Sequence, residues 1–186
     1  VGEIITNNRL NGERTVFMGD YVGMLHEVKS IKDTEDIAEK ITVSIGVGVK
    51  IIPSQKIITF TQNRQDDWVL IQSADLMNWK IKFNGLKQTP NYKSSTNQRF
   101  NSHGLTGCLT FYESEFQNTS IEVDGGVCED SLNIISSKGS ISSIMIKDAY
   151  ADAIDIDFSL IKISDVNIKK SGNDCVDVSG GNYTLD

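Results

Sequence analysis

The strongest candidates for functional residues are aspartates in the last third of the chain. They recur at a fixed spacing. One series, spaced by 22 residues, consists of Asp130, Asp152 and Asp174. A second series with the same spacing consists of Asn133, Asp155 and Asp177. Neighbouring carboxylates can hold a cation, accept hydrogen bonds from a sugar, or act as acid and base on a glycosidic bond. At turns the same residue types cap backbone N–H groups, so the spacing alone leaves these uses open.

Apolar residues with the same spacing indicate which elements position these aspartates. The segments EDSLNI (129–134), ADAIDI (151–156) and NDCVDV (173–178) align so that apolar and polar residues alternate. Alternation by two within a repeat of 22 residues is typical of stacked strands, whereas a helical repeat needs apolar residues three and four apart. The pattern predicts an all-β fold, a single-stranded right-handed parallel β-helix. Its coils of about 22 residues would lie about 4.8 Å apart.

The alternation also assigns residues to the two faces of a strand. If the apolar residues of IDIDF (154–158) point into the core, Asp155 and Asp157 point outward. Asp177 then lies over Asp155 one coil further along the solenoid. Asn133 precedes Asp155 in the same column, and we therefore predict that Asn133, Asp155 and Asp157 bind a ligand.

The polar stretch 85–106 has no repeat and predicts a long excursion from the body of the solenoid. Long excursions of this kind are often functional, although solvent-exposed variability is the simpler explanation. Two aromatic residues in it, Tyr92 and Phe100, are candidates for packing against a sugar ring.

The N-terminal half of the chain is less regular. Segments 47–62 and 67–83 predict strands of earlier coils, and 30–41 predicts a short helix that would cap the open end of the solenoid. We expect residues 1–186 to form a single domain, which is either processed or a piece of a larger protein.

The segment YADAIDIDFSLIKISDVNIKKSGNDCVDV (150–178) resembles the central coils of polygalacturonases, pectin-hydrolysing enzymes of the pectin-lyase-like superfamily. That family carries Asn-Thr-Asp on one coil and Gly-Asp-Asp-Cys on the next. The resemblance implies a link to polysaccharides, and an active enzyme would use Asp152, Asp174 and Asp177. However, Asn173 stands where the family has a carboxylic acid, and an amide cannot donate a proton to a leaving group. The match therefore favours sugar binding over hydrolysis.

The three cysteines predict no covalent cross-link within the chain. Cys108 and Cys175 fall in one column three coils apart, about 14 Å, whereas a disulfide needs Cα atoms within about 7 Å. Cys128 lies three residues before the position that this column has on its coil, so it is expected to lie next to neither Cys108 nor Cys175. We expect all three to be small, semi-buried residues. Their spacing does not suit zinc, so no metal site is predicted. The stacked carboxylates leave open a bound calcium ion, and no other cofactor is expected.

Composition and charge narrow the classes of partner. A formal net charge of −7 disfavours nucleic acid as a partner, because phosphate binding needs clustered Lys and Arg. The longest apolar run, 41–52, is too short and too rich in glycine for membrane insertion.

The sequence thus predicts a polysaccharide-associated surface module, extracellular or at the cell surface, that binds or presents carbohydrate. One alternative is a polysaccharide hydrolase or lyase acting on acidic glycans. Another is a scaffold or assembly segment of a larger surface protein, whose last coil stacks on further repeats or associates end to end with a second copy.

Overall fold

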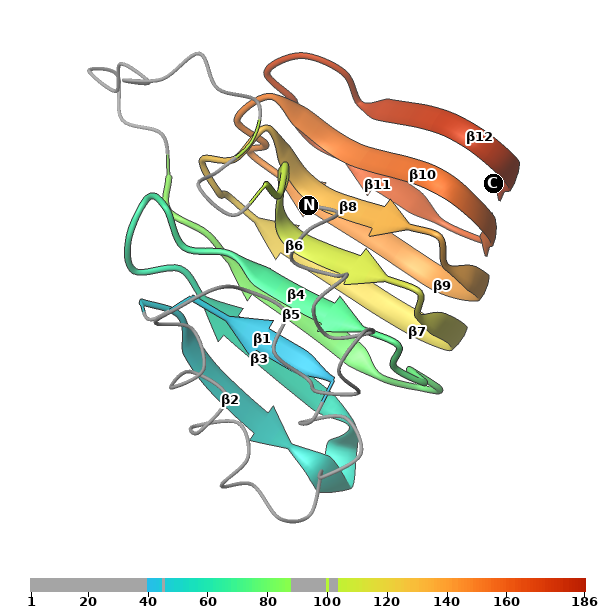
Figure 1. The fold of residues 1–186 in the computed structure, drawn as a ribbon, viewed down its shortest axis with the longest axis horizontal. Helices are drawn as coiled ribbons and strands as arrows, with labels where there is room; N and C mark the ends of the chain where they lie inside the picture. The colour runs from blue at the N-terminus through green and yellow to red at the C-terminus, as the bar shows by residue number, and fades with distance from the viewer. Residues whose placement is uncertain (1–39, 45, 88–99, 101–103) are drawn as a thin grey trace.

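The described part of the chain is a stack of parallel coils. The computed structural model describes residues 40–44, 46–87, 100 and 104–186, which form a β-solenoid of about five turns (Figure 1). Its strands are β1 (Ile41–Val43), β2 (Gly48–Ile52), β3 (Ile57–Thr61), β4 (Val69–Gln72), β5 (Lys80–Asn84), β6 (Gly107–Tyr112), β7 (Glu115–Asp124), β8 (Asp130–Ile135), β9 (Lys138–Lys147), β10 (Asp152–Ile163), β11 (Val166–Ile168) and β12 (Val176–Leu185). The predicted all-β parallel β-helix is confirmed. Within these ranges no helix is long and apolar enough to cross a membrane.

Successive coils stack parallel strands on three faces, the first two of which are called the first and second sheets. The first sheet contains β4, β6, β8 and the first halves of β10 and β12. The second sheet contains β3, β5, the second halves of β7 and β9, and β11. The long strands β7, β9, β10 and β12 bend at the coil corners. The other halves of these strands pair with one another on a third face, where Lys138 of β9 pairs with Glu115 of β7 and with Leu160 of β10.

The strand register confirms the columns spaced by 22 residues. Leu132 pairs with Leu109 on β6 and with Ile154 on β10, and Ile154 pairs with Val176 on β12. Leu109, Leu132 and Ile154 are completely buried. Each such side chain contributes about 1.5–3 kcal/mol by leaving water. One hydrophobic cluster built from columns of this kind extends from Ile41 to Tyr183 and holds the coils together.

A corner of the same conformation recurs on successive coils between the first sheet and the third face. At this corner the alternation of inward and outward residues differs by one residue from the predicted one. The corner residues with left-handed backbone are Glu113 (φ 50°), Ser136 (φ 48°) and Phe158 (φ 50°). Each is followed by a buried serine, and these serines form a ladder. The backbone N–H of Ser137 donates to Ser159 Oγ, and that of Ser114 donates to Ser137 Oγ, each at 3.0 Å. Phe158, predicted to point inward, is therefore 69% exposed, because Ser159 takes the inward position.

The N-terminal end differs from the prediction. β1 pairs antiparallel with β4, and β2 pairs antiparallel with β3. The predicted helix 30–41 is wrong at its last residue, because Ile41 starts β1, while residues 30–39 lie outside the described residues. The segment ITV (41–43) is rich in β-branched residues, and the edge of β4 offers it a ladder of hydrogen bonds.

The cysteines also overturn a prediction. Cys108 and Cys128 form a disulfide with Cα atoms 5.4 Å apart. Cys128 lies in the turn before β8 and not in a strand column, so counting columns misplaced it. Gly126 (φ 110°) makes this turn possible, since a Cβ there would lie 2.9 Å from Cys108 Sγ. Cys175, expected to be semi-buried, is free and exposed because it lies on the last described coil.

Candidate functional site

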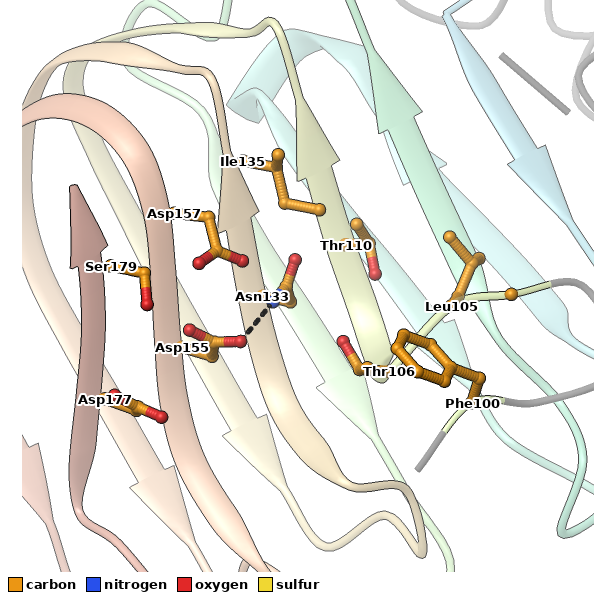
Figure 2. A pocket seen from close by; sticks show the side chains of 11 residues that line it. Phe100, Leu105, Thr106, Thr110, Asn133, Ile135, Asp155, Asp157, Asp177 and Ser179 are labelled. Carbon is orange, nitrogen blue, oxygen red and sulfur yellow. Dashed lines mark hydrogen bonds between the residues drawn. The ribbon is translucent and has the colours of Figure 1, made fainter. Parts of the chain in front are cut away.

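A groove lies on the outer surface of the first sheet, across β6, β8, β10 and β12 (Figure 2). It encloses about 330 Å³. Its lining residues are Phe100, Gly104, Leu105, Thr106, Thr110, Asn133, Ile135, Asp155, Asp157, Asp177 and Ser179. The structure therefore brings together the predicted ligand-binding residues Asn133, Asp155, Asp157 and Phe100 with Asp177, which was a candidate catalytic residue. Tyr92, the remaining candidate, lies outside the described residues.

The floor of the groove is a column of four polar residues, one from each strand. Thr110 pairs with Asn133, Asn133 with Asp155, and Asp155 with Asp177. Adjacent strands are about 4.8 Å apart, so the column presents a hydroxyl, an amide and two carboxylates over about 14 Å. The alternation places these side chains outward, because their neighbours, such as Leu109 and Ile154, fill the core.

A hydrogen bond fixes the orientation of the Asn133 amide. Asn133 Nδ2 donates to Asp155 Oδ2 at 2.9 Å and, at 3.4 Å, to Asp130 Oδ2. The amide oxygen therefore faces away from Asp155, toward the space between Asp157, Ile135 and Thr110 in Figure 2. Asn133 is 1% exposed, and its Oδ1 has no hydrogen-bond partner among the described residues.

Thr110 carries a second buried oxygen of this kind. Thr110 is 1% exposed, and its Oγ1 has no hydrogen-bond partner in the described part of the chain. Gly107 makes room for it, because a Cβ at that position would lie 2.6 Å from Thr110 Oγ1 and 2.8 Å from Asn133 Cβ. A buried oxygen without a hydrogen bond costs about 1–3 kcal/mol. Two of them in one groove therefore mark a place where a ligand that donates hydrogen bonds would be stabilised.

The outer surface of the first sheet is partly covered, which the alternation did not predict. Leu105 packs with Trp68, Leu70 and Tyr112 in a second hydrophobic cluster on this side of the sheet. Asp155 points outward as predicted but is only 8% exposed. At the rim, Phe100 is 52% exposed. The site is therefore a recess with an aromatic ring beside it and not an open acidic surface.

The described lining of the groove carries three carboxylates. Asp155, Asp157 and Asp177 line it, and none of the described lining residues is Lys, Arg or His. Asp155 and Asp157 make further interactions within the chain. Asp177 is half-buried, and its carboxylate makes no hydrogen bond or ion pair with any described residue.

The candidate catalytic residues Asp152 and Asp174 lie outside the groove lining. Asp152 is 3% exposed, and its Oδ1 accepts hydrogen bonds from Asn173 Nδ2 at 2.7 Å and from the backbone N–H of Asp174 at 2.8 Å. Asp174 is exposed. Asp152 therefore caps the turn that leads into β12, which is the structural use left open for this series.

Metal binding was the other use left open for the carboxylates. In the described ranges, no group of three or more His, Cys, Asp or Glu side chains is arranged to hold a metal ion. The bound calcium ion stays a prediction.

On the second sheet, two lysines of β5 form ion pairs with a glutamate of β7. Lys82 Nζ lies 3.2 Å from Glu122 Oε2, and Lys80 Nζ lies 3.7 Å from it. Burial alone would raise the pKa of Glu122, but the hydrogen bond and charge of Lys82 hold that pKa below its ordinary value. In the turns that follow this sheet, Lys87 contacts Asp124 and Asp148. The hydrogen bond from Lys87 and its charge lower the pKa of Asp148.

Sequence reasoning missed part of the groove. Thr110 lies 23 residues before Asn133, so extending the polar column by one coil would have found it. No pattern in the sequence pointed to Leu105 or Gly107. Their roles depend on contacts in the folded protein, of Leu105 with Trp68 and of Gly107 with Thr110.

Comparison with protein-family models, curated proteins and solved structures finds no match. The coil architecture therefore rests on the strand pairing, and the resemblance of 150–178 to polygalacturonases stays a prediction.

Proposed function

We propose that this β-solenoid is a carbohydrate-binding module and that the groove on the first sheet holds the sugar. The observation that carries the proposal is the pair of buried oxygens, Thr110 Oγ1 and Asn133 Oδ1, which lack partners among the described residues in a groove that three carboxylates also line. A sugar presents a row of hydroxyl groups that can donate hydrogen bonds to these two oxygens. Phe100 at the rim adds an exposed aromatic face for the apolar side of a sugar ring.

Binding is a better proposal than hydrolysis. Asp152, which the polygalacturonase resemblance would make catalytic, is buried and accepts two hydrogen bonds at a turn. Asn173 donates one of them, so the residue that replaces the family's acid has a structural partner.

The disulfide supports an extracellular or cell-surface location as part of the same proposal. Disulfides such as Cys108–Cys128 persist mainly in oxidising compartments. The count of free thiols in the purified native protein tests this point. One reactive thiol per chain, from Cys175, is expected, and three would contradict it.

Two isosteric substitutions test the binding site. Thr110→Val removes a buried hydroxyl that has no partner among the described residues, so the free energy of unfolding should stay the same or rise. Thr119→Val is the matched control, since Thr119 is equally buried but its Oγ1 donates to the Leu76 carbonyl at 2.7 Å.

Isothermal titration against soluble neutral, amino and acidic oligosaccharides measures the outcome. Thr110→Val should weaken the binding of the tightest oligosaccharide about fivefold or more. Thr119→Val should lose about 1 kcal/mol of stability and keep wild-type affinity. Affinity that is unchanged in Thr110→Val, or absence of binding by any oligosaccharide, would contradict the proposal.

End-to-end assembly is a second candidate function, favoured by the exposed side of the last described coil. β12 pairs with β10 on one side, and Val178 (46% exposed) and Leu185 (41% exposed) continue inward apolar columns. An open strand edge with apolar side chains can pair with another chain.

Sedimentation velocity over a range of protein concentrations tests this candidate. Val178→Lys should weaken self-association, whereas Thr184→Lys, which points outward from the same strand, should affect it less. A monomer at all concentrations would overturn the assembly candidate and leave the carbohydrate proposal intact.

A further inference from the structure

The chemistry of the groove indicates which sugars it favours. The amide of Asn133 is turned so that its N–H donates to Asp155 and its oxygen faces the groove. The groups aimed at a ligand are therefore mainly acceptors, namely Asn133 Oδ1 and the carboxylate of Asp177. A ligand that fits must donate hydrogen bonds.

The carboxylates in the groove further limit the class of ligand that it favours. Asp155 and Asp177 pair in register on adjacent strands, so two carboxylates lie side by side at about the strand spacing. The Asp177 carboxylate has no hydrogen bond or ion pair with the described residues, so a cationic donor beside it would be attracted by its charge. A carboxylate brought by the ligand would be repelled by the same charge and would be disfavoured.

We propose that the groove selects sugars that carry a free amino group, with Asp177 as the residue that receives the ammonium. The inference rests on the proposed carbohydrate-binding function and names its ligand class. Asp177 suits the role because it lines the groove, is half-buried, and its carboxylate makes no hydrogen bond or ion pair with the described residues. Thr110 and Asn133, further along the column, receive hydroxyls of the same ring or of the next one. Acidic glycans, which the resemblance to pectin-hydrolysing enzymes suggests, are disfavoured.

Three tetrasaccharides test the inference by isothermal titration: a β-1,4-linked glucosamine tetramer, its fully N-acetylated counterpart, and tetragalacturonate. EDTA is included so that no divalent cation bridges two carboxylates. Acetylation removes the charge of the amine and keeps the sugar backbone, so the glucosamine tetramer should bind about tenfold more tightly than the acetylated one. Tetragalacturonate should bind more weakly than either.

Asp177→Asn should remove most of the preference for the amine, a loss of about tenfold, because it removes the charge and nearly keeps the shape. Asp165→Asn is the control. It makes the same chemical change on an exposed turn between β10 and β11, and should leave the preference within about twofold.

The outcomes separate this inference from the proposal beneath it. Tight binding of the acetylated or acidic tetramer that is weakened by Thr110→Val overturns the amine preference and supports the groove as a sugar site. A preference that persists in Asp177→Asn also overturns the inference. Absence of binding by all three tetramers overturns the amine preference, and the carbohydrate proposal falls with it only if no other neutral oligosaccharide binds either.

Discussion

The two sheets of this solenoid share one architecture but differ in how they treat outward-facing charge. Beside the second sheet, Lys80, Lys82 and Glu122 form ion pairs across neighbouring strands. On the first sheet, the matching outward column reads Thr110, Asn133, Asp155 and Asp177, in a groove whose described lining has no basic residue. The inward columns of both sheets are equally apolar and buried.

The difference lies in what the two arrangements contribute to stability. Opposite charges on an exposed strand face are a common way to keep a sheet soluble and in register. Buried oxygens without partners among the described residues, such as Thr110 Oγ1 and Asn133 Oδ1, cost stability. The first sheet carries this cost, and the proposed ligand would offset it.

Removing the disulfide should have the largest effect, and should act on the first sheet. Cys108 lies in β6 and Cys128 in the turn before β8, so the bond ties two strands of the groove together. Replacing both cysteines by serine should lower the free energy of unfolding by about 3 kcal/mol in urea denaturation. Cys175→Ser, an exposed free cysteine, is the control and should cost less than about 0.5 kcal/mol. Equal stability of the double variant and the wild type would show that the disulfide does not support this sheet.

Asp152→Ala should have an intermediate effect on the free energy of unfolding. It should distinguish a structural role of Asp152 from a catalytic one. The substitution removes the acceptor of two hydrogen bonds at the turn before β12, so the free energy of unfolding should fall by about 1–2 kcal/mol. Asp165→Ala, on an exposed turn, should be nearly neutral. A fully stable Asp152→Ala variant that had lost hydrolysis of an acidic polysaccharide would reverse the assignment of Asp152 as a capping residue.

Glu122→Gln on the second sheet should have the smallest effect, and that effect should depend on pH. The pKa of Glu122 is lower in the folded protein, so its ion pair stabilises the fold above the ordinary pKa of a glutamate, about 4.3. This contribution is lost as the pH falls through the lowered pKa. Chemical denaturation at pH 7 should show the variant about 0.5 kcal/mol less stable, and the difference should shrink toward pH 3 and in high salt. A difference that grew with acidity would mean that Glu122 is not stabilised by its lysines.

The columns of the solenoid were predictable because each depends on local alternation and a constant repeat. Leu132, Ile154 and Val176 have the same neighbours on every coil, so spacing in the sequence converts directly into position. The outward direction of Asn133 and Asp155 followed from the same periodicity.

Features at the corners were not predictable in this way. The left-handed backbone at Phe158 shifts the alternation by one residue and buries Ser159, although the spacing of Ser114, Ser137 and Ser159 was visible. Cys128 was misplaced because a turn does not keep the strand register. Leu105 packs against Trp68, a contact between residues distant in sequence that no local pattern encodes.

The most direct test of the groove as a sugar site is an NMR titration of the ¹⁵N-labelled protein with whichever of the three tetrasaccharides binds most tightly. Saturable shifts of the backbone amides of Thr110, Asn133 and Asp177 are predicted, with those of Lys82 and Glu122 unchanged. Saturable shifts confined to the second sheet, or none on either sheet, would contradict the assignment of the groove as the carbohydrate site.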